Sequence, residues 1–123
     1  MRTLRVHISS PNMQKVQGFK ESLQGSWLTL FNSNITTSDI LRALLMLGLE
    51  LLNSSENYTH NNYVITKMLN APLWIHDTVE QRASYFTLSK TKIVQEAIHR
   101  ACMHCDTPKT LLRALIDNHR EIY

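Results

Sequence analysis

The sequence predicts a mainly α-helical fold with two short β-strands, in which the order strand, helix, helix occurs twice before one further helix. Two observations lead to this prediction. A hydroxylated residue opens an apolar helical segment twice, at Thr36 and at Ser89, an offset of 53 residues. Each segment also follows a stretch of β-forming residues that ends at a proline, Pro11 or Pro72. The chain therefore consists of two related halves.

Length and composition fit one folded domain. Hydrophobic residues make up 43% of the 123 residues and charged residues 19%, as in ordinary folded proteins. We expect a single domain with four parts: a first repeat (1–53), a loop (54–62), a second repeat (63–105) and a C-terminal helix (106–123).

The net charge and the lengths of the apolar stretches restrict the functional class only slightly. The net charge of +3 suits a polyanionic partner, although a small basic excess is common. The first residues lack the apolar run of a signal peptide. The longest apolar stretch, residues 40–52, is interrupted by Arg42 and Glu50 and is too short to cross a bilayer. We therefore expect a cytoplasmic protein with no membrane partner.

The first half begins with a strand and continues with two helices. Apolar and polar residues alternate over 3–9, which predicts a strand with one face in the core. Over 12–30 the apolar residues have helical spacing, although Gly18 and Gly25 lie within this helix. A second helix is predicted from about residue 37 to about Asn53. Because it is apolar on nearly all sides, we expect it at the centre of the fold.

The second half repeats this order with shorter spacing. We predict a strand over 63–71, a short helix that begins at Asp77 or Thr78, and a helix from Ser89 to about residue 104. From the proline to the capping hydroxyl the first half has 25 residues and the second 17. About eight extra residues therefore belong to the first helix of the first half or to the turn after it. A threonine followed by a proline then predicts the start of a last helix over 107–123.

This order resembles the ribbon-helix-helix family of DNA-binding proteins, the family of the Arc and methionine repressors. The likeness is closer in the second half, where it includes Pro72, Val79, Ala83 and the run 89–98. Tandem copies in one chain resemble the DNA-binding proteins of conjugative plasmids. The resemblance implies that the two strands pair antiparallel into a ribbon, either within one chain as a pseudo-dimer or between two chains.

The resemblance also implies base-contacting residues, because in this family alternate side chains of the ribbon enter the major groove. By position from the prolines they are Thr3, Arg5 and His7 in the first strand and Thr66, Met68 and Asn70 in the second. Arg5 suits a guanine edge and Asn70 an adenine edge. Lys67 stands where an inward apolar residue is expected, so a register shifted by one residue in the second strand stays open.

The residues that open the two central helices are the predicted phosphate contacts. A helix start offers unpaired amides and the positive end of the helix dipole to an anion. The residues concerned are Thr36, Thr37 and Ser38 in the first half, and Ser89, Lys90, Thr91 and Lys92 in the second. Hydroxyl caps also occur in proteins that bind no DNA. Asp39 takes the place of Lys92 in the first half, so we expect the two halves to hold DNA unequally.

Two cysteines near the end of the second half allow a zinc site or a thiol–imidazole pair, since several histidines are close in sequence. A closed zinc site needs four ligands, and a pair of cysteines alone is weak evidence for one. The offset of 53 places Cys102 and Cys105 opposite Leu49 and Leu52, on the apolar side of the first central helix. We therefore expect buried thiols, no metal, no cofactor and no enzymatic activity.

These features predict a sequence-specific DNA-binding transcriptional regulator, a repressor or an activator, with plasmid or mobile-element transfer genes as candidate targets. Two alternatives stay open. One is an accessory protein that bends DNA at an origin of transfer or partition. The other is an antitoxin-type protein that holds a protein partner through residues 107–123. The expected partner is double-stranded DNA, with further copies of the chain on that DNA left open.

Overall fold

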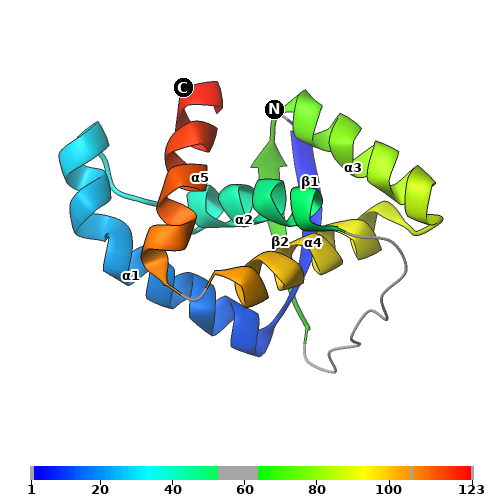
Figure 1. Ribbon diagram of the computed structural model, residues 1–123, viewed down its shortest axis with the longest axis horizontal. Coiled ribbons are helices and arrows are strands. Elements are labelled where there is room, and N and C mark those ends of the chain that lie inside the picture. The colour runs from blue at the N-terminus through cyan, green and yellow to red at the C-terminus, as the bar shows by residue number, and fades with distance from the viewer. Residues whose placement is uncertain (1, 53–63, 106, 123) are drawn as a thin grey trace.

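The computed structural model describes residues 2–52, 64–105 and 107–122, and the predicted loop at 54–62 lies outside them. The chain order is strand, helix, helix, repeated once, with a fifth helix at the end (Figure 1). The elements are β1 (Arg2–Ser9), α1 (Ser10–Phe31), α2 (Thr37–Leu51), β2 (Val64–Ala71), α3 (Leu73–Phe86), α4 (Lys90–His104) and α5 (Pro108–Ile122).

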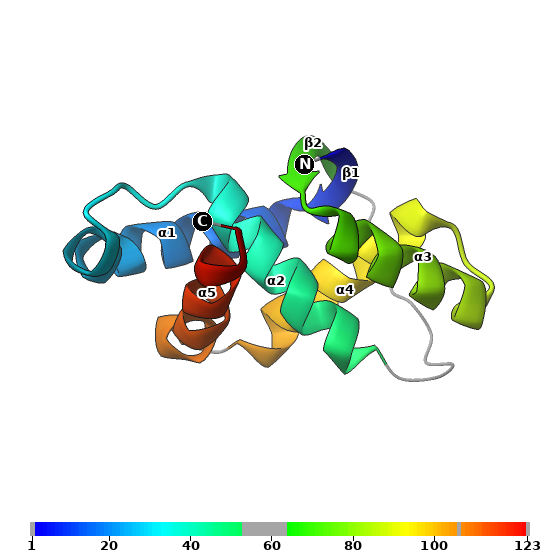
Figure 2. The ribbon, with the colours of Figure 1, turned by 90° about the horizontal axis from the view of Figure 1, so that it is seen from above.

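The two strands form an antiparallel sheet within one chain. Pairing runs from Arg2 opposite Ala71 to Ser9 opposite Val64. Along β1 every second residue is buried, as the alternation predicts: Leu4, Val6 and Ile8. The strands lie at one surface of the molecule, and α2 and α4 cross beneath them (Figure 2). We call this two-stranded sheet the ribbon and its solvent-facing side the outer face.

The register of β2 matches the position expected from Pro72. Lys67 lies opposite Val6, on the buried side of the ribbon, and Leu69, two residues further on, is fully buried. A strand shifted by one residue is therefore wrong, because it would turn Leu69 to solvent. Lys67 is nevertheless exposed. Its flexible four-carbon stem lets the ammonium reach water from an inward-facing position.

The helices α2 and α4 form the centre of the fold, as the apolar composition of α2 predicts. Buried residues run along both, including Ile40, Leu44 and Leu45 in α2 and Ile93 and Ile98 in α4. They touch backbone to backbone at one point. A Cβ atom added to Gly48 would lie 1.7 Å from the carbonyl oxygen of Ala97. The hydrogen side chain of Gly48 therefore sets how closely the two helices approach.

The two outer helices differ in length and in how they begin. The helix α1 has 22 residues and passes without a break through both of its glycines, whereas α3 has 14. The predicted start of α3 at Asp77 or Thr78 is wrong, because α3 begins at Leu73 with Pro72 as its N-cap. Pro72 is already extended, and its carbonyl accepts the first bonds of the helix. The Thr78 hydroxyl donates to the carbonyl of Trp74 inside α3.

The helix α5 packs mainly against α2 and also contacts the end of the longer α1. The side chain of His119 on α5 lies against two aromatic rings at the end of α1, with ring centroids 5.2 Å from Trp27 and 4.0 Å from Phe31. Leu111 and Leu115 of α5 are fully buried. The apolar side of α5 is thus part of the core. None of the described helices is both long and apolar enough to cross a membrane.

Both cysteines are buried, as the offset from the first half predicts. Burial raises the pKa of the Cys102 thiol from its ordinary value of 9.0 to about 12, while Lys15 lowers this pKa and Cys105 raises it further. Between about pH 9 and pH 12 the unfolded chain releases this proton and the folded chain keeps it. The thiol therefore favours unfolding as the pH rises through that window.

We accordingly expect the free energy of unfolding to fall from pH 8 to pH 10 more in the native protein than in a Cys102→Ala variant. The contribution of this thiol is at most about 1.4 kcal/mol per pH unit. Urea unfolding of both proteins at the two pH values measures it. The quantity compared is the change in the free energy of unfolding between the two pH values in each protein. The cavity left by Cys102→Ala and the titration of other groups affect both pH values or both proteins alike, so they cancel. Equal losses in the two proteins would contradict a buried, protonated thiol at position 102.

Candidate nucleic-acid interface

The outer face of the ribbon brings all six predicted base-contacting side chains together. The strand register pairs Thr3 with Asn70, Arg5 with Met68 and His7 with Thr66. Because directly opposite residues of an antiparallel pair share a face, the six side chains form one patch of three rows. Five of the six residues are exposed, and His7 is half-buried. We call this set the outer patch.

Hydrogen bonds fix the two outer rows of the patch. The Thr3 hydroxyl donates to Oδ1 of Asn70 at 3.1 Å, and Oγ1 of Thr66 is bonded to Nδ1 of His7 at 3.2 Å. The middle row is different. Met68 is 60% exposed, and among the described residues no carboxylate forms an ion pair with Arg5. The centre of the patch therefore offers an unpaired guanidinium and an apolar side chain to a ligand.

The start of α2 is closed by its own side chains. The Thr36 hydroxyl accepts from the amide of Asp39 at 3.1 Å, and the Asp39 carboxylate accepts from the amide of Thr36 at 3.0 Å, a reciprocal capping box. Thr37 and Ser38 follow in the first turn and are half-buried. The Asp39 carboxylate thus already accepts from an amide at this helix start, and the unequal hold of the two halves on DNA stays a prediction.

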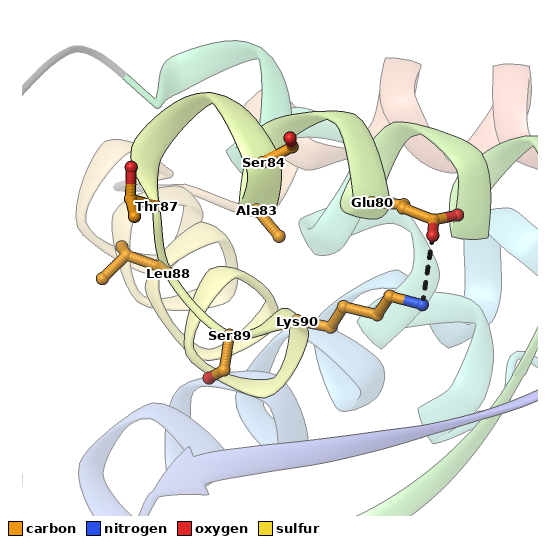
Figure 3. Close-up of a pocket in the computed structure, with 7 residues that line it drawn as sticks. All are labelled: Glu80, Ala83, Ser84, Thr87, Leu88, Ser89 and Lys90. Carbon is orange, nitrogen blue, oxygen red and sulfur yellow. Dashed lines mark ion pairs between the residues drawn. The ribbon is translucent and has the colours of Figure 1, made fainter.

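The start of α4 carries the opposite charge. The Ser89 hydroxyl accepts from the amide of Lys92 at 3.1 Å. Lys90 reaches from the helix start to Glu80 on α3, at 3.6 Å, across an open depression of the surface (Figure 3). Both side chains of this pair are more than half exposed, so the pair is weak and a phosphate can replace the carboxylate.

The other two residues predicted at this helix start are less accessible. Thr91 is half-buried, and Nζ of Lys92 lies 3.5 Å from the buried carboxylate of Glu96. The two helix starts themselves lie on opposite sides of the ribbon, α2 toward α1 and α4 toward α3 (Figures 1 and 2). The two helix starts on either side of the ribbon therefore differ: a capping box closes the start of α2, and the start of α4 carries the exposed Lys90.

Sequence reasoning missed Arg42, which the structure places directly beneath the outer patch. Its side chain is almost fully buried, and it bonds the Asp39 carboxylate at 2.8 Å and the carbonyl of Asn70 at 3.0 Å. The signal in the sequence is an aspartate three residues before an arginine on a mostly apolar helix, since a buried charge requires a partner. The sequence alone does not reveal that the second bond reaches β2.

Within residues 2–52, 64–105 and 107–122, no three side chains of His, Cys, Asp or Glu lie together as a metal site requires. Comparison of the chain with protein-family models, curated proteins and solved structures found no match in any of the three. The outer patch and the helix starts are therefore the features that bear on function.

Proposed function

We propose that this protein binds double-stranded DNA by inserting the ribbon into the major groove, with a ribbon-helix-helix arrangement formed inside one chain. The observation that carries the proposal is the outer patch. A two-stranded ribbon fits the major groove, and alternate residues on its outer side then face the base edges. At those alternate positions stand an arginine, an amide, a histidine, two hydroxyls and an exposed methionine.

Each side chain of the patch has a chemical counterpart on a base. The guanidinium of Arg5 can donate two bonds to guanine, and the amide of Asn70 can both donate to and accept from adenine. Met68, directly opposite Arg5 in the middle row, suits the methyl group of thymine. Because the two strands carry different residues, the preferred DNA site need not be a palindrome. We propose that occupancy of such a site regulates transcription.

The direct test is selection from a pool of duplex DNA with a randomised centre, followed by a binding titration with fluorescence anisotropy. The proposal predicts enrichment of one sequence family and tighter binding to it than to a scrambled duplex. A protein that enriches no sequence, or that binds no duplex even at low salt, does not have the proposed function.

A Lys90→Ala variant is expected to bind the selected and the scrambled duplex more weakly by similar factors. Lys90 would contact phosphate, which is the same in every sequence, and the slope of log K against log salt should drop by about one. Anisotropy titrations at several salt concentrations measure both quantities. Lys109→Ala is the matched control, because Lys109 is an exposed lysine at the start of α5, away from the ribbon (Figure 2). If both variants lose affinity equally, the loss reflects net charge and α4 does not hold phosphate.

A further inference from the structure

A chain of five hydrogen bonds runs from the start of α2 to the outer patch. At the helix start, Thr36 and Asp39 bond each other reciprocally. Arg42 then donates from Nη2 to Oδ1 of Asp39 at 2.8 Å and from Nη1 to the carbonyl of Asn70 at 3.0 Å. On the outer side, the Thr3 hydroxyl donates to Oδ1 of Asn70 at 3.1 Å. Asn70 is thus held from below through its backbone and from the side through its amide.

The second half does not repeat the two charged residues of this connection. The residue 53 positions after Asp39 is Lys92, and the residue 53 positions after Arg42 is Gln95. The helix α4 therefore lacks both members of the buried pair. In α2 the pair is almost completely removed from water, with side-chain exposures of 5% for Arg42 and 11% for Asp39. A buried ion pair contributes little net stability compared with apolar residues, which makes a role in fixing geometry the better explanation.

Asn70 needs such support, because it lies one residue from the end of β2 in a sheet of only two strands. The ends of a two-stranded sheet are held weakly. A bidentate contact to adenine requires the amide to sit within about half an ångström of its correct position. In the structure the oxygen end of the Asn70 amide faces Thr3 and accepts from its hydroxyl.

We propose that Arg42 is a positioning residue for base recognition: it holds Asn70 in the geometry needed to contact a base and ties this end of the outer patch to the capped start of α2. The inference rests on the proposed DNA binding and adds a specificity-determining residue that does not itself touch DNA. The preference for one base at the position that Asn70 contacts would then also depend on the start of α2, which lies beneath the ribbon.

The test compares base preference, position by position, in variants of the whole protein. An Asn70→Ala variant first identifies the base pair at which the native preference depends on Asn70. The paired change Asp39→Asn with Arg42→Met removes both buried charges together, so that neither is left unpaired in the core. Arg42→Lys is a second variant that keeps the charge but cannot make two bonds with the same geometry. Gln95→Ala is the control at the corresponding position of α4.

One bidentate contact provides a preference of roughly fivefold or more for the correct base. In both Arg42 variants we expect the preference at the Asn70 base pair to fall by at least about threefold. Preferences at other positions and the salt dependence should be unchanged. In the Asn70→Ala background, changing Arg42 should cause no further loss, because Arg42 acts only through Asn70. A purely structural role would instead alter every position together.

The outcomes separate this inference from the proposed function. Native protein that enriches no sequence overturns both. If the native protein selects a sequence but the Arg42 variants keep the full preference at the Asn70 base pair, only the inference fails. It also fails alone if Asn70→Ala leaves the selected sequence unchanged, or if changing Arg42 in the Asn70→Ala background lowers preference further.

Discussion

A Gly48→Ala variant is expected to unfold at a much lower urea concentration than the native protein. The added Cβ would lie 1.7 Å from the carbonyl oxygen, 2.3 Å from the carbonyl carbon and 2.8 Å from the Cα of Ala97. These are backbone atoms of α4, so no side-chain rotation can make room. The helices α2 and α4 would have to move apart, and that would loosen the contacts of the most deeply buried residues in the protein.

We expect the free energy of unfolding to fall by about 3 kcal/mol, at the upper end of the usual range for overpacking. The sign is the informative part, because alanine normally stabilises a helix relative to glycine by up to about 1 kcal/mol. Gly18→Ala and Gly25→Ala are the matched controls. Both glycines are exposed in α1, and an added Cβ meets no atom within 4 Å. These two variants should gain stability. A Gly48→Ala variant that gains stability as well would contradict the close crossing of α2 and α4.

An Arg5→Ala variant is expected to lose most of its preference for the selected DNA sequence while keeping much of its binding to a scrambled duplex. Arg5 lies in the middle row of the outer patch beside the exposed Met68. Under the proposed binding mode its guanidinium donates two bonds to one guanine, worth about 1–3 kcal/mol of discrimination. This corresponds to a loss of about 5- to 150-fold in the ratio of the two affinities.

Two further variants separate base recognition from charge. Arg5→Lys keeps the charge but not the two parallel donors, so it should retain the salt dependence and lose the preference for guanine. Arg113→Ala removes the same charge from an exposed position on α5 and should leave the preference intact. Anisotropy titrations with the selected and the scrambled duplex, each at several salt concentrations, measure all three variants. If Arg5→Ala lowers both affinities by the same factor, Arg5 contacts phosphate and not a base.

Local patterns were enough to predict the order of the elements and the outward residues of β1, whereas the outward residues of β2 also depended on the resemblance to the ribbon-helix-helix family. Alternation along β1 predicted which of its residues face outward, because strand side chains alternate with a period of two. In β2 the position relative to Pro72 gave the same kind of prediction, but Lys67 left its register open. The hydroxyl caps at Thr36 and Ser89 marked the starts of α2 and α4 to within one residue. The start of α3 was wrong because the prediction looked for a capping side chain. Pro72 needs none, since its extended backbone and its carbonyl begin the helix.

The remaining features depend on residues that are distant in sequence. Arg42 interrupts the apolar pattern of α2, and nothing local shows that its guanidinium meets the carbonyl of Asn70, 28 residues further on. In the same way, the close contact of Gly48 with Ala97 exists only once the two helices have crossed. The exposure of Lys67 reflects the reach of a long side chain, which the alternation of a strand does not describe.

The pairing of β1 with β2 inside a single polypeptide has a consequence for how the surface can change. In a sheet built by two identical chains, every substitution appears twice, once on each edge. Here Arg2–Ser9 and Val64–Ala71 are separate stretches of one sequence, and each row of the sheet contains two independently encoded residues. A replacement at Arg5 therefore leaves Met68 as it was. Dilution cannot separate the strands either, because one molecule supplies both.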